Sequence, residues 1–330
     1  MTDPQLSVVM PVFNAARYLS DAVESILSQT FSDFEFLIFD DGSTDQSLEI
    51  LYRYAAIDER LRIVQGQHKG YAHWLNQGIR TARGEFVARM DADDISLPER
   101  LLEQVEYMQD HPECVAVGCD VLVIDENGQD LGVDQHESCP ELMEKLLLNG
   151  THGVIAHPTS LMRRRAVLEV GLYREEYECI EDFDLWMRLS EIGKLGNVCR
   201  SLFKYRIHPS SVCSSKFRIQ QRHADTIIRE ARLKRGLKPL QRSVWPTIHR
   251  TDDEAARLQL WSGCFLSLGQ KTMALRYAYA SIRRRPFAAS SWLALSRIVI
   301  PRTIKTIVKN LLVDREYSKH VHETQTLSMQ

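Results

Sequence analysis

The fold is decided by residues 84–94, which read Gly-Glu-Phe-Val-Ala-Arg-Met-Asp-Ala-Asp-Asp. The run from Glu85 to Met90 is typical of a buried strand, and Arg83-Gly84 before it is typical of a helix end. The strand passes directly into three aspartates. Because ligands of open α/β sheets bind at the carboxyl ends of the strands, this order predicts a ligand site lined with carboxylates.

The same alternation of apolar runs and helical patterns extends on both sides of this stretch. The expected strands are 6–12, 34–39 and 61–64, and the expected helices are 15–29 with Asn14 as cap, a helix through 48–51, and 70–81. Strands that alternate with helices form a mostly parallel sheet covered on both faces. The sequence therefore predicts an α/β fold.

The three aspartates favour a hard divalent cation. If the chain stays extended after the strand, Asp91 and Asp93 point to the same side, and their mutual repulsion favours an ion such as Mg2+ held together with substrate phosphates. The alternative is a capping cluster, in which Asp94 or Ser96 caps the helix that has Pro98 in its first turn.

A second acidic segment, residues 40–45, also follows an expected strand and reads Asp-Asp-Gly-Ser-Thr-Asp. A carboxylate there can accept hydrogen bonds from a nucleobase or from ribose hydroxyls, and the alternative is a simple turn with a helix cap. Neither acidic segment follows a glycine-rich dinucleotide turn or a P-loop, so those two nucleotide-binding motifs are not expected.

Two further candidates lie in the next hundred residues. Residues 181–189 combine acids with an apolar helix face, so a carboxylate in the first turn is either a general base or an acid that interacts with the helix dipole. His208 is a metal ligand, a phosphate contact or a surface histidine.

The charge is divided unevenly along the chain. Residues 216–330 hold 22 Lys and Arg against 8 Asp and Glu, although the whole chain has a net charge of −3. We therefore expect a division near residue 215 between an acidic domain and a basic helical region, with helices at 255–268, 271–285 and 290–300. Residues 301–312 form an amphipathic basic pattern, typical of either a packed helix or a helix on an anionic membrane.

The composition also bounds the location. Seven cysteines without a CxxC pair favour a reducing compartment, and the longest apolar stretch, 287–300, is too short to span a bilayer. The N-terminus lacks the basic region of a signal peptide. The expected location is the cytoplasm, either free or peripheral on the inner face of the membrane.

Taken together, these segments resemble the family 2 glycosyltransferases over about residues 5–213. The resemblance rests on the following segments: 7–14 (Ser-Val-Val-Met-Pro-Val-Phe-Asn), 29–31 (Gln-Thr-Phe), 40–45, 84–94 and 181–186 (Glu-Asp-Phe-Asp-Leu-Trp). It implies the GT-A fold of nucleotide-diphospho-sugar transferases, with a mostly parallel central sheet, and leaves the C-terminal helical region, 216–330, unassigned.

The resemblance also implies roles for single residues. It makes Asp91 and Asp93 the DxD pair, with Asp93 and His208 as metal ligands for Mn2+ or Mg2+, and Asp182 the catalytic base. The residues it places around the nucleotide or its diphosphate and sugar are Pro11, Phe13, Asn14, Asp41, Lys69 and Arg89, and it places Gly171 and Tyr173 in the loop before the base.

The implied activity is that of a metal-dependent, inverting hexosyltransferase. The donor is a nucleotide-diphosphate sugar, most commonly of UDP, and the acceptor is a saccharide, free or lipid-linked, in cell-surface polysaccharide or glycan assembly. No QxxRW-like segment of processive synthases is present, so a single transfer is expected. The alternatives are a nucleotidyltransferase, a silent nucleotide- or carbohydrate-binding protein and, least favoured, a nucleic-acid binder.

Overall fold

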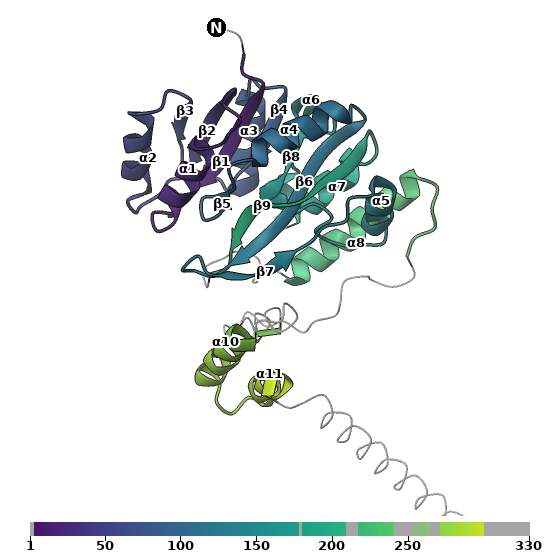
Figure 1. The fold of residues 1–330 in the computed structure, drawn as a ribbon. Helices are drawn as coiled ribbons and strands as arrows, with labels where there is room; N and C mark the ends of the chain where they lie inside the picture. Colours follow the sequence, from purple (N-terminus) through teal and green to yellow (C-terminus); the bar gives the residue numbers. More distant parts are fainter. Residues whose placement is uncertain are drawn as a thin grey trace, which may run out of the picture. The chain divides into compact units, whose positions relative to one another are not determined.

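The computed structural model describes residues 3–177, 180–208 and 217–240, and, from 255 onward, scattered residues up to 263 and then 271–299. The chain forms two compact units, Met1–Ile248 and His249–Gln330. The first unit is a nine-stranded sheet with helices on both faces (Figure 1).

The N-terminal half of the first unit is the predicted parallel layer. Its strands lie in the order β3 (Leu61–Gln65), β2 (Phe34–Asp40), β1 (Leu6–Val12) and β4 (Phe86–Arg89), and all three pairings are parallel. Helices α1 (Leu19–Leu27), α2 (Ser47–Ala55) and α3 (Tyr71–Thr81) connect these strands. The predicted order of strands and helices is confirmed here.

The other half continues the sheet with mixed pairing. Strand β8 (Leu161–Arg163) is antiparallel to both β4 and β6 (Cys114–Ile124), and β9 (Lys194–Arg206) is parallel to β6. The short β5 (Ile95–Ser96) pairs with β9, and β7 (Asp130–Asp134) with β6. The helices of this half are α4 (Arg100–Asp110), α5 (Pro140–Leu148), α6 (Arg164–Glu169), α7 (Glu181–Leu189) and α8 (Phe217–Lys234), with the 3-10 turns η1 (His157–Thr159) and η2 (Glu175–Tyr177).

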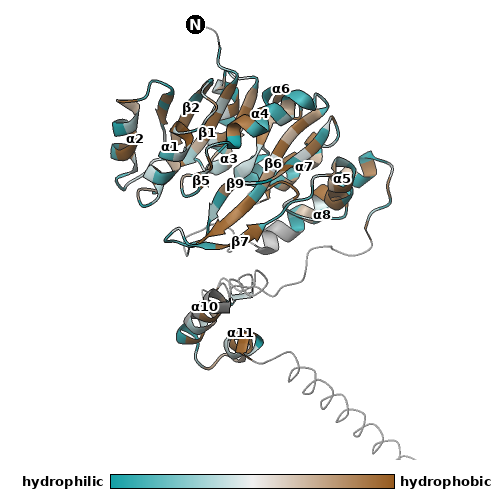
Figure 2. Ribbon diagram, in the orientation of Figure 1, coloured by the Kyte–Doolittle hydropathy of each residue, from teal (hydrophilic) through white to brown (hydrophobic). Residues whose placement is uncertain are grey.

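Two hydrophobic layers hold the sheet between its helices. Alternate residues of β1 enter opposite layers: Val8 and Met10 pack with α1, whereas Val9 packs with α3. All residues of β1 and β2 are buried, as expected for a sheet covered on both faces, and Figure 2 shows brown, hydrophobic segments in these strands and in bands on the helices around them. At Gly78 an added Cβ would lie 2.3 Å from the Val9 side chain, so α3 approaches the sheet closely.

Helix α8 belongs to the first unit. Its buried residues Ala224, Ile227, Ile228 and Ala231 join the hydrophobic layer of α5 and α7. The compact units therefore divide at residue 248, because apolar packing keeps α8 with the sheet although its surface is basic. The functional division near residue 215 stays a prediction.

The second unit contains the helices α10 (Lys271–Arg284) and α11 (Ala289–Val299), which pack against each other. These confirm two of the predicted C-terminal helices within a residue or two at each end. The predicted helix 255–268 lies mostly, and 301–312 entirely, outside the described residues. Among the helices that are described, none has the length and apolarity needed to cross a bilayer.

Candidate functional site

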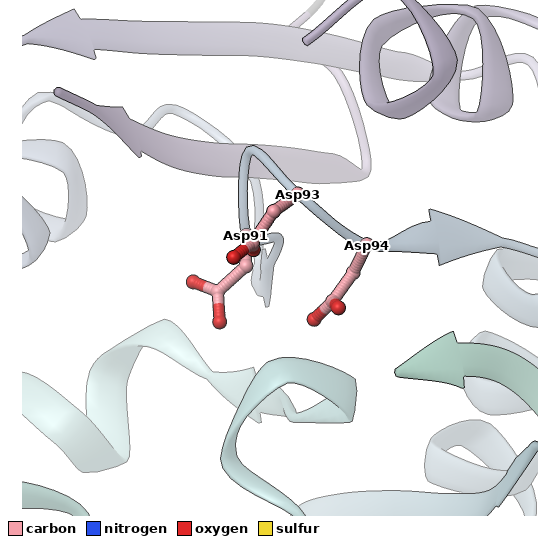
Figure 3. Close-up of side chains that lie close together, drawn as sticks. All are labelled: Asp91, Asp93 and Asp94. Carbon is pink, nitrogen blue, oxygen red and sulfur yellow. The ribbon is translucent and has the colours of Figure 1, made fainter. Parts of the chain in front are cut away.

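The acidic cluster consists of Asp91, Asp93 and Asp94 in the loop between β4 and β5. One carboxylate oxygen from each residue lies within 4.8 Å of the others, and Figure 3 shows the three side chains grouped at this loop. The alternative role for these residues, capping of the next helix by Asp94 or Ser96, is not observed, because α4 begins at Arg100 and no side chain caps it. The sheet edge thus gathers three carboxylates, as the sequence predicts.

Asp91 is held from the side of α3. Its Oδ1 accepts hydrogen bonds from Arg89 Nη2 at 2.6 Å and from the Tyr71 hydroxyl at 3.1 Å. Burial raises the pKa of Asp91 to about 6, although the Arg89 guanidinium opposes the shift and the charge of Asp93 adds to it. A cation bound beside Asp91, in addition to the Arg89 guanidinium, would lower the pKa of Asp91 and favour its ionised form.

Asp94 is the most enclosed member of the cluster. It is 1% exposed, and its Oδ1 accepts the backbone N–H of Arg206 at 2.7 Å. Its Oδ2 is buried and has no hydrogen-bond partner in the described chain. Burial and the neighbouring charges of Asp93 and Asp91 raise the pKa of Asp94 well above its ordinary value. A buried carboxylate oxygen without a hydrogen-bond partner costs free energy unless a ligand binds it. The acidic cluster therefore fits a hard cation, which prefers oxygen ligands.

Asp93 contacts His208, which is distant in the sequence. Asp93 Oδ2 lies 2.7 Å from His208 Nε2, and the imidazole, 7% exposed overall, packs against the Tyr18 ring at 5.2 Å. Strand β9 ends two residues before His208 and pairs with β5, which follows the cluster, so the pairing brings the two residues together. Asp93 and His208, the two residues predicted as metal ligands, therefore lie in contact with each other.

Asp41 sits at the end of β2 and is 4% exposed. Its Oδ1 accepts the Lys69 backbone N–H at 2.6 Å and the Trp74 indole N–H, and its Oδ2 accepts the Gly70 N–H at 3.0 Å and lies 2.9 Å from His68 Nδ1. The turn after β2 is held instead by Asp40, whose Oδ2 accepts the N–H groups of residues 42 and 43. Both carboxylate oxygens of Asp41 therefore contact the segment before α3 and Trp74 rather than the turn after β2.

The loop beside Asp41 contains the other residues predicted for the nucleotide. Pro11 is buried at the end of β1, whereas Phe13 is 46% exposed and its ring lies 4.4 Å from that of His68. Asn14 does not cap α1 as predicted: it has φ 49°, its Oδ1 accepts the Thr44 N–H at 2.8 Å, and α1 begins at Leu19. Asn14 therefore joins the loop after β1 to the loop after β2.

The remaining predicted contacts differ in their surroundings. The Arg89 side chain is buried beside Asp91, and its Nη1 has no hydrogen-bond partner in the described part of the chain. The Lys69 side chain is exposed, and it is the backbone N–H of Lys69 that contacts Asp41.

Asp182 lies in the first turn of α7, 9% exposed. Its Oδ1 accepts the Phe183 N–H at 2.8 Å and lies 3.6 Å from Nε2 of His152. The next acid in the helix, Asp184, is fully buried and accepts hydrogen bonds from Arg174 and Arg188. These contacts fix α7, and with it the position of Asp182.

An aromatic group connects the acidic cluster with α7; it consists of Tyr71, His157, Tyr173 and Trp186. The His157 ring lies 6.0 Å from the rings of both Tyr71 and Trp186, and its Nε2 is 2.9 Å from the Tyr173 hydroxyl. Burial lowers the pKa of His157 well below its usual value, with the Arg89 charge acting in the same direction, so the ring is neutral. Tyr173 was expected in the loop before the base, but Tyr71 and His157 were missed, because single aromatic residues in a sequence look like core residues.

Known proteins are similar to this chain in sequence. The profile of the family described as glycosyl transferase family 2 matches residues 7–171. EpsE of Bacillus subtilis (strain 168) is 36% identical over 209 residues, which cover 62% of this chain and 73% of EpsE. The O-antigen biosynthesis glycosyltransferase WbnJ of Escherichia coli is 31% identical over 217 residues, covering 64% of this chain and 82% of WbnJ.

Solved structures show the same fold. Residues 1–349 of S. aureus TarS superpose with a TM-score of 0.52 and 18% identity, covering 89% of this chain and 90% of that one. The mannosyltransferase PcManGT from Pyrobaculum calidifontis gives a TM-score of 0.51 at 17% identity, covering 94% and 84%. The fold is therefore GT-A, and the match of the family profile over half of the sequence shows that the chain belongs to glycosyl transferase family 2 and is a glycosyltransferase.

Proposed function

We propose that this glycosyltransferase moves a single sugar from a nucleotide-diphosphate sugar to an acceptor hydroxyl, with a divalent cation and with inversion at the anomeric carbon. The observation that carries the proposal is the acidic cluster, whose Asp94 Oδ2 is buried without a partner in the described residues. A nucleotide-sugar donor is supported by TarS, solved with UDP-GlcNAc and with UDP, and by PcManGT, solved with GDP-Man and Mn2+.

The acidic cluster and His208 would hold the cation, Mn2+ or Mg2+. The three carboxylates suit either ion, since both prefer oxygen ligands, and His208 would add one imidazole nitrogen. When bound, the ion supplies a Lewis acid that offsets the charge on the departing diphosphate.

The residues of the chain supply positioning and proton transfer. Asp41 binds the nucleoside, and Pro11, Phe13 and Asn14 lie beside it. Both carboxylate oxygens of Asp41 already contact groups of the protein, so the donor competes with His68 for Asp41. Arg89, whose Nη1 lacks a partner in the described chain, donates to the diphosphate or sugar, and Lys69 at the same loop offers a second positive charge. These contacts orient the anomeric carbon.

Asp182 is proposed as the base. Its Oδ1 is engaged by the Phe183 N–H, so its Oδ2 takes the proton of the acceptor hydroxyl as that oxygen attacks the anomeric carbon. The aromatic group, between Asp182 and the acidic cluster, keeps water from competing with the acceptor. Attack from the face opposite the leaving diphosphate inverts the configuration.

The acceptor is proposed to be a saccharide, free or lipid-linked, in the assembly of a cell-surface polysaccharide or glycan. The name of WbnJ, an O-antigen biosynthesis enzyme, supports this class. We also propose a cytoplasmic location at the inner face of the membrane, and the four described cysteines, Cys114, Cys119, Cys139 and Cys199, are free thiols that suit a reducing compartment.

The proposal is tested with a panel of UDP- and GDP-sugars. Thermal unfolding is measured with Mn2+ or with EDTA, and the stabilising donors are then assayed for hydrolysis and transfer by wild-type protein and by Asp182→Asn. We expect Mn2+-dependent stabilisation by at least one donor, turnover by the wild type, and binding without turnover by Asp182→Asn. Donor binding without turnover in the wild type would instead support a silent binding protein, and equal turnover by the variant would exclude Asp182 as base.

A further inference from the structure

Helix α4 begins with an arginine that has no exposed surface. Within the described part of the chain, Arg100 forms no ion pair with a carboxylate, and its side chain contacts Gln104 Oε1 at 3.1 Å, the Arg89 carbonyl at 2.8 Å, the Met90 sulfur at 3.9 Å and the Phe203 ring. Burial lowers the pKa of Arg100 to about 10, so the guanidinium is still protonated at neutral pH. A buried charge without a hydrogen-bonded counterion costs free energy, so we looked for what this charge stabilises.

Arg100 completes the hydrogen bonding at the end of β4. Continuing the register of β4 with β8 by one residue places Arg89 opposite Ser160, and the Arg89 N–H donates to the Ser160 carbonyl at 2.9 Å. The return bond of an antiparallel pair is not made, because the Ser160 N–H donates to the carbonyl of His157 in η1 at 3.2 Å. Arg100 Nη2 supplies the missing donor to the Arg89 carbonyl. Arg100 therefore fixes the last residue of β4, two positions before Asp91.

The same guanidinium is connected to η1 through Gln104, which is also fully buried. Gln104 lies one helical turn after Arg100; its Oε1 accepts the bond from Arg100 Nε, and its Nε2 donates to the Thr159 carbonyl at 2.8 Å. The Arg89 side chain, whose carbonyl Arg100 holds, donates to Asp91 Oδ1 at 2.6 Å. A chain of hydrogen bonds thus runs from η1 through α4 to a carboxylate of the acidic cluster.

The charge of Arg100 also acts on the acidic cluster. The carboxylates of Asp94 and Asp91 favour the charged form of Arg100, and the Arg100 charge in turn opposes the rise in the pKa of Asp91 that burial causes. Three carboxylates with oxygens within 4.8 Å of one another repel, and a fixed cation nearby reduces that repulsion. The charges that Arg100 balances are therefore the acids of the cluster, although it forms no hydrogen bond with them.

We propose that Arg100 is a positioning residue for the divalent cation: its guanidinium fixes the end of β4, and its charge allows the three carboxylates of the acidic cluster to face one another before the cation binds. The inference rests on the proposed function, because it requires that the acidic cluster binds a divalent cation. Residues that hold the ligands of a metal ion typically contribute about 10–100-fold to its affinity.

The test is Mn2+ binding by the full chain without nucleotide, measured by isothermal titration calorimetry together with the electron paramagnetic resonance spectrum of the bound ion. Arg100→Met keeps most of the side-chain volume but removes the charge and all donors, so we expect binding about 10–100-fold weaker and an altered spectrum of the Mn2+ that still binds. Arg100→Lys keeps the charge and a donor, and its loss should be smaller. If circular dichroism shows that Arg100→Met does not fold, Gln104→Leu, which leaves Arg100 Nε without its acceptor, should still weaken binding by about tenfold.

Arg163→Met is the matched control. Arg163 also donates to two backbone carbonyls, those of Cys114 and Met108, and lies over the Phe86 ring, but it pairs with the beginning of β4 rather than with its end. Its replacement should lower the thermal stability and leave the Mn2+ affinity and spectrum unchanged.

The outcomes separate this inference from the proposed function. Mn2+ binding by the wild type with equal affinity and spectrum in Arg100→Met would overturn the inference alone. So would a loss in Arg100→Lys as large as that in Arg100→Met, or equal weakening by Arg163→Met, because general destabilisation would then explain the effect. Absence of Mn2+ binding by the wild type would overturn the proposed function and the inference with it.

Discussion

The ion pairs of Asp184 give a prediction that connects the stability of the fold with the position of Asp182. Asp184 has no exposed surface, and its two oxygens accept hydrogen bonds from Arg174 Nε at 3.0 Å and from Arg188 Nε and Nη2 at 2.9 and 2.6 Å. The Arg188 guanidinium also donates to the carbonyls of Val170 and Leu172. Asp184→Asn would leave the Arg188 guanidinium without the carboxylate it contacts, and Arg174 with the more distant Glu230, whose Oε2 lies 4.0 Å from Arg174 Nη1.

The expected loss can be worked from these contacts. Removing one partner of a buried ion pair costs about 3–5 kcal/mol, and the lower end applies because the Arg174 side chain is 32% exposed and can turn to water. With a urea slope of about 3 kcal/mol per molar, appropriate to a large unit, the unfolding midpoint should fall by about 1 M. Because α7 carries Asp182, transfer activity should fall as well.

The assay is urea unfolding followed by circular dichroism, with Glu85→Gln as the control. Glu85 forms an ion pair with Arg163, but its side chain is 64% exposed, so its loss should cost less than about 1 kcal/mol. A midpoint shift in Asp184→Asn no larger than that of Glu85→Gln would refute the view that the buried ion pairs fix α7.

Two further predictions concern the sheet. Burial raises the pKa of Glu35, but hydrogen bonds from the Arg83 N–H, the Ser7 hydroxyl and the Arg83 guanidinium outweigh it and leave the pKa lowered. Glu35→Gln should therefore lower the free energy of unfolding by about 1–3 kcal/mol at pH 7. The difference in stability between wild type and variant should shrink as the pH falls through and below about 4.5, because the Glu35 carboxylate then becomes protonated. Unfolding measured at pH 7 and pH 3 checks this, and an equal difference at both pH values would contradict the role of the ionised carboxylate. At Gly84 an added Cβ would lie 2.6 Å from Ser7 N, so Gly84→Ala should destabilise the protein by about 1–3 kcal/mol in thermal unfolding. Gly263→Ala is the control, because open space surrounds the added Cβ there and no destabilisation is expected. Equal effects of the two substitutions would refute the steric argument.

The sequence predicts those features that depend on local pattern. The strands of the parallel half are short, mainly apolar runs, and the acidic cluster begins two residues after β4, so both could be predicted from residues 6–94. The pairing of strands that lie far apart in the sequence could not be predicted in this way. The contact between Asp93 and His208 depends on β5 pairing with β9, and β5 is only two residues long.

Competing hydrogen bonds and packing explain the other differences between the expectations from the sequence and the structure. Asn14 is a good helix cap by residue type, yet its side chain bonds Thr44, and α1 consequently begins at Leu19. Helix α8 belongs to the expected basic region by its charge, yet a buried stripe through Ile227 and Ile228 packs it on the first unit, and the functional division near residue 215 stays a prediction. Tyr71 and His157 gave no signal, because their role depends on neighbours that only the fold brings close.

The most direct test of the central claim is a Mn2+ titration in which the free ion is followed by electron paramagnetic resonance, with UDP or GDP present. The claim is that the acidic cluster binds a divalent cation that in turn binds the donor diphosphate. Wild-type protein is predicted to bind Mn2+, more tightly with the nucleotide, and Asp93→Ala and Asp94→Asn are predicted to weaken binding by at least about tenfold, which is about 1.4 kcal/mol. Absence of binding by the wild type, or equal binding by the variants, would contradict the account.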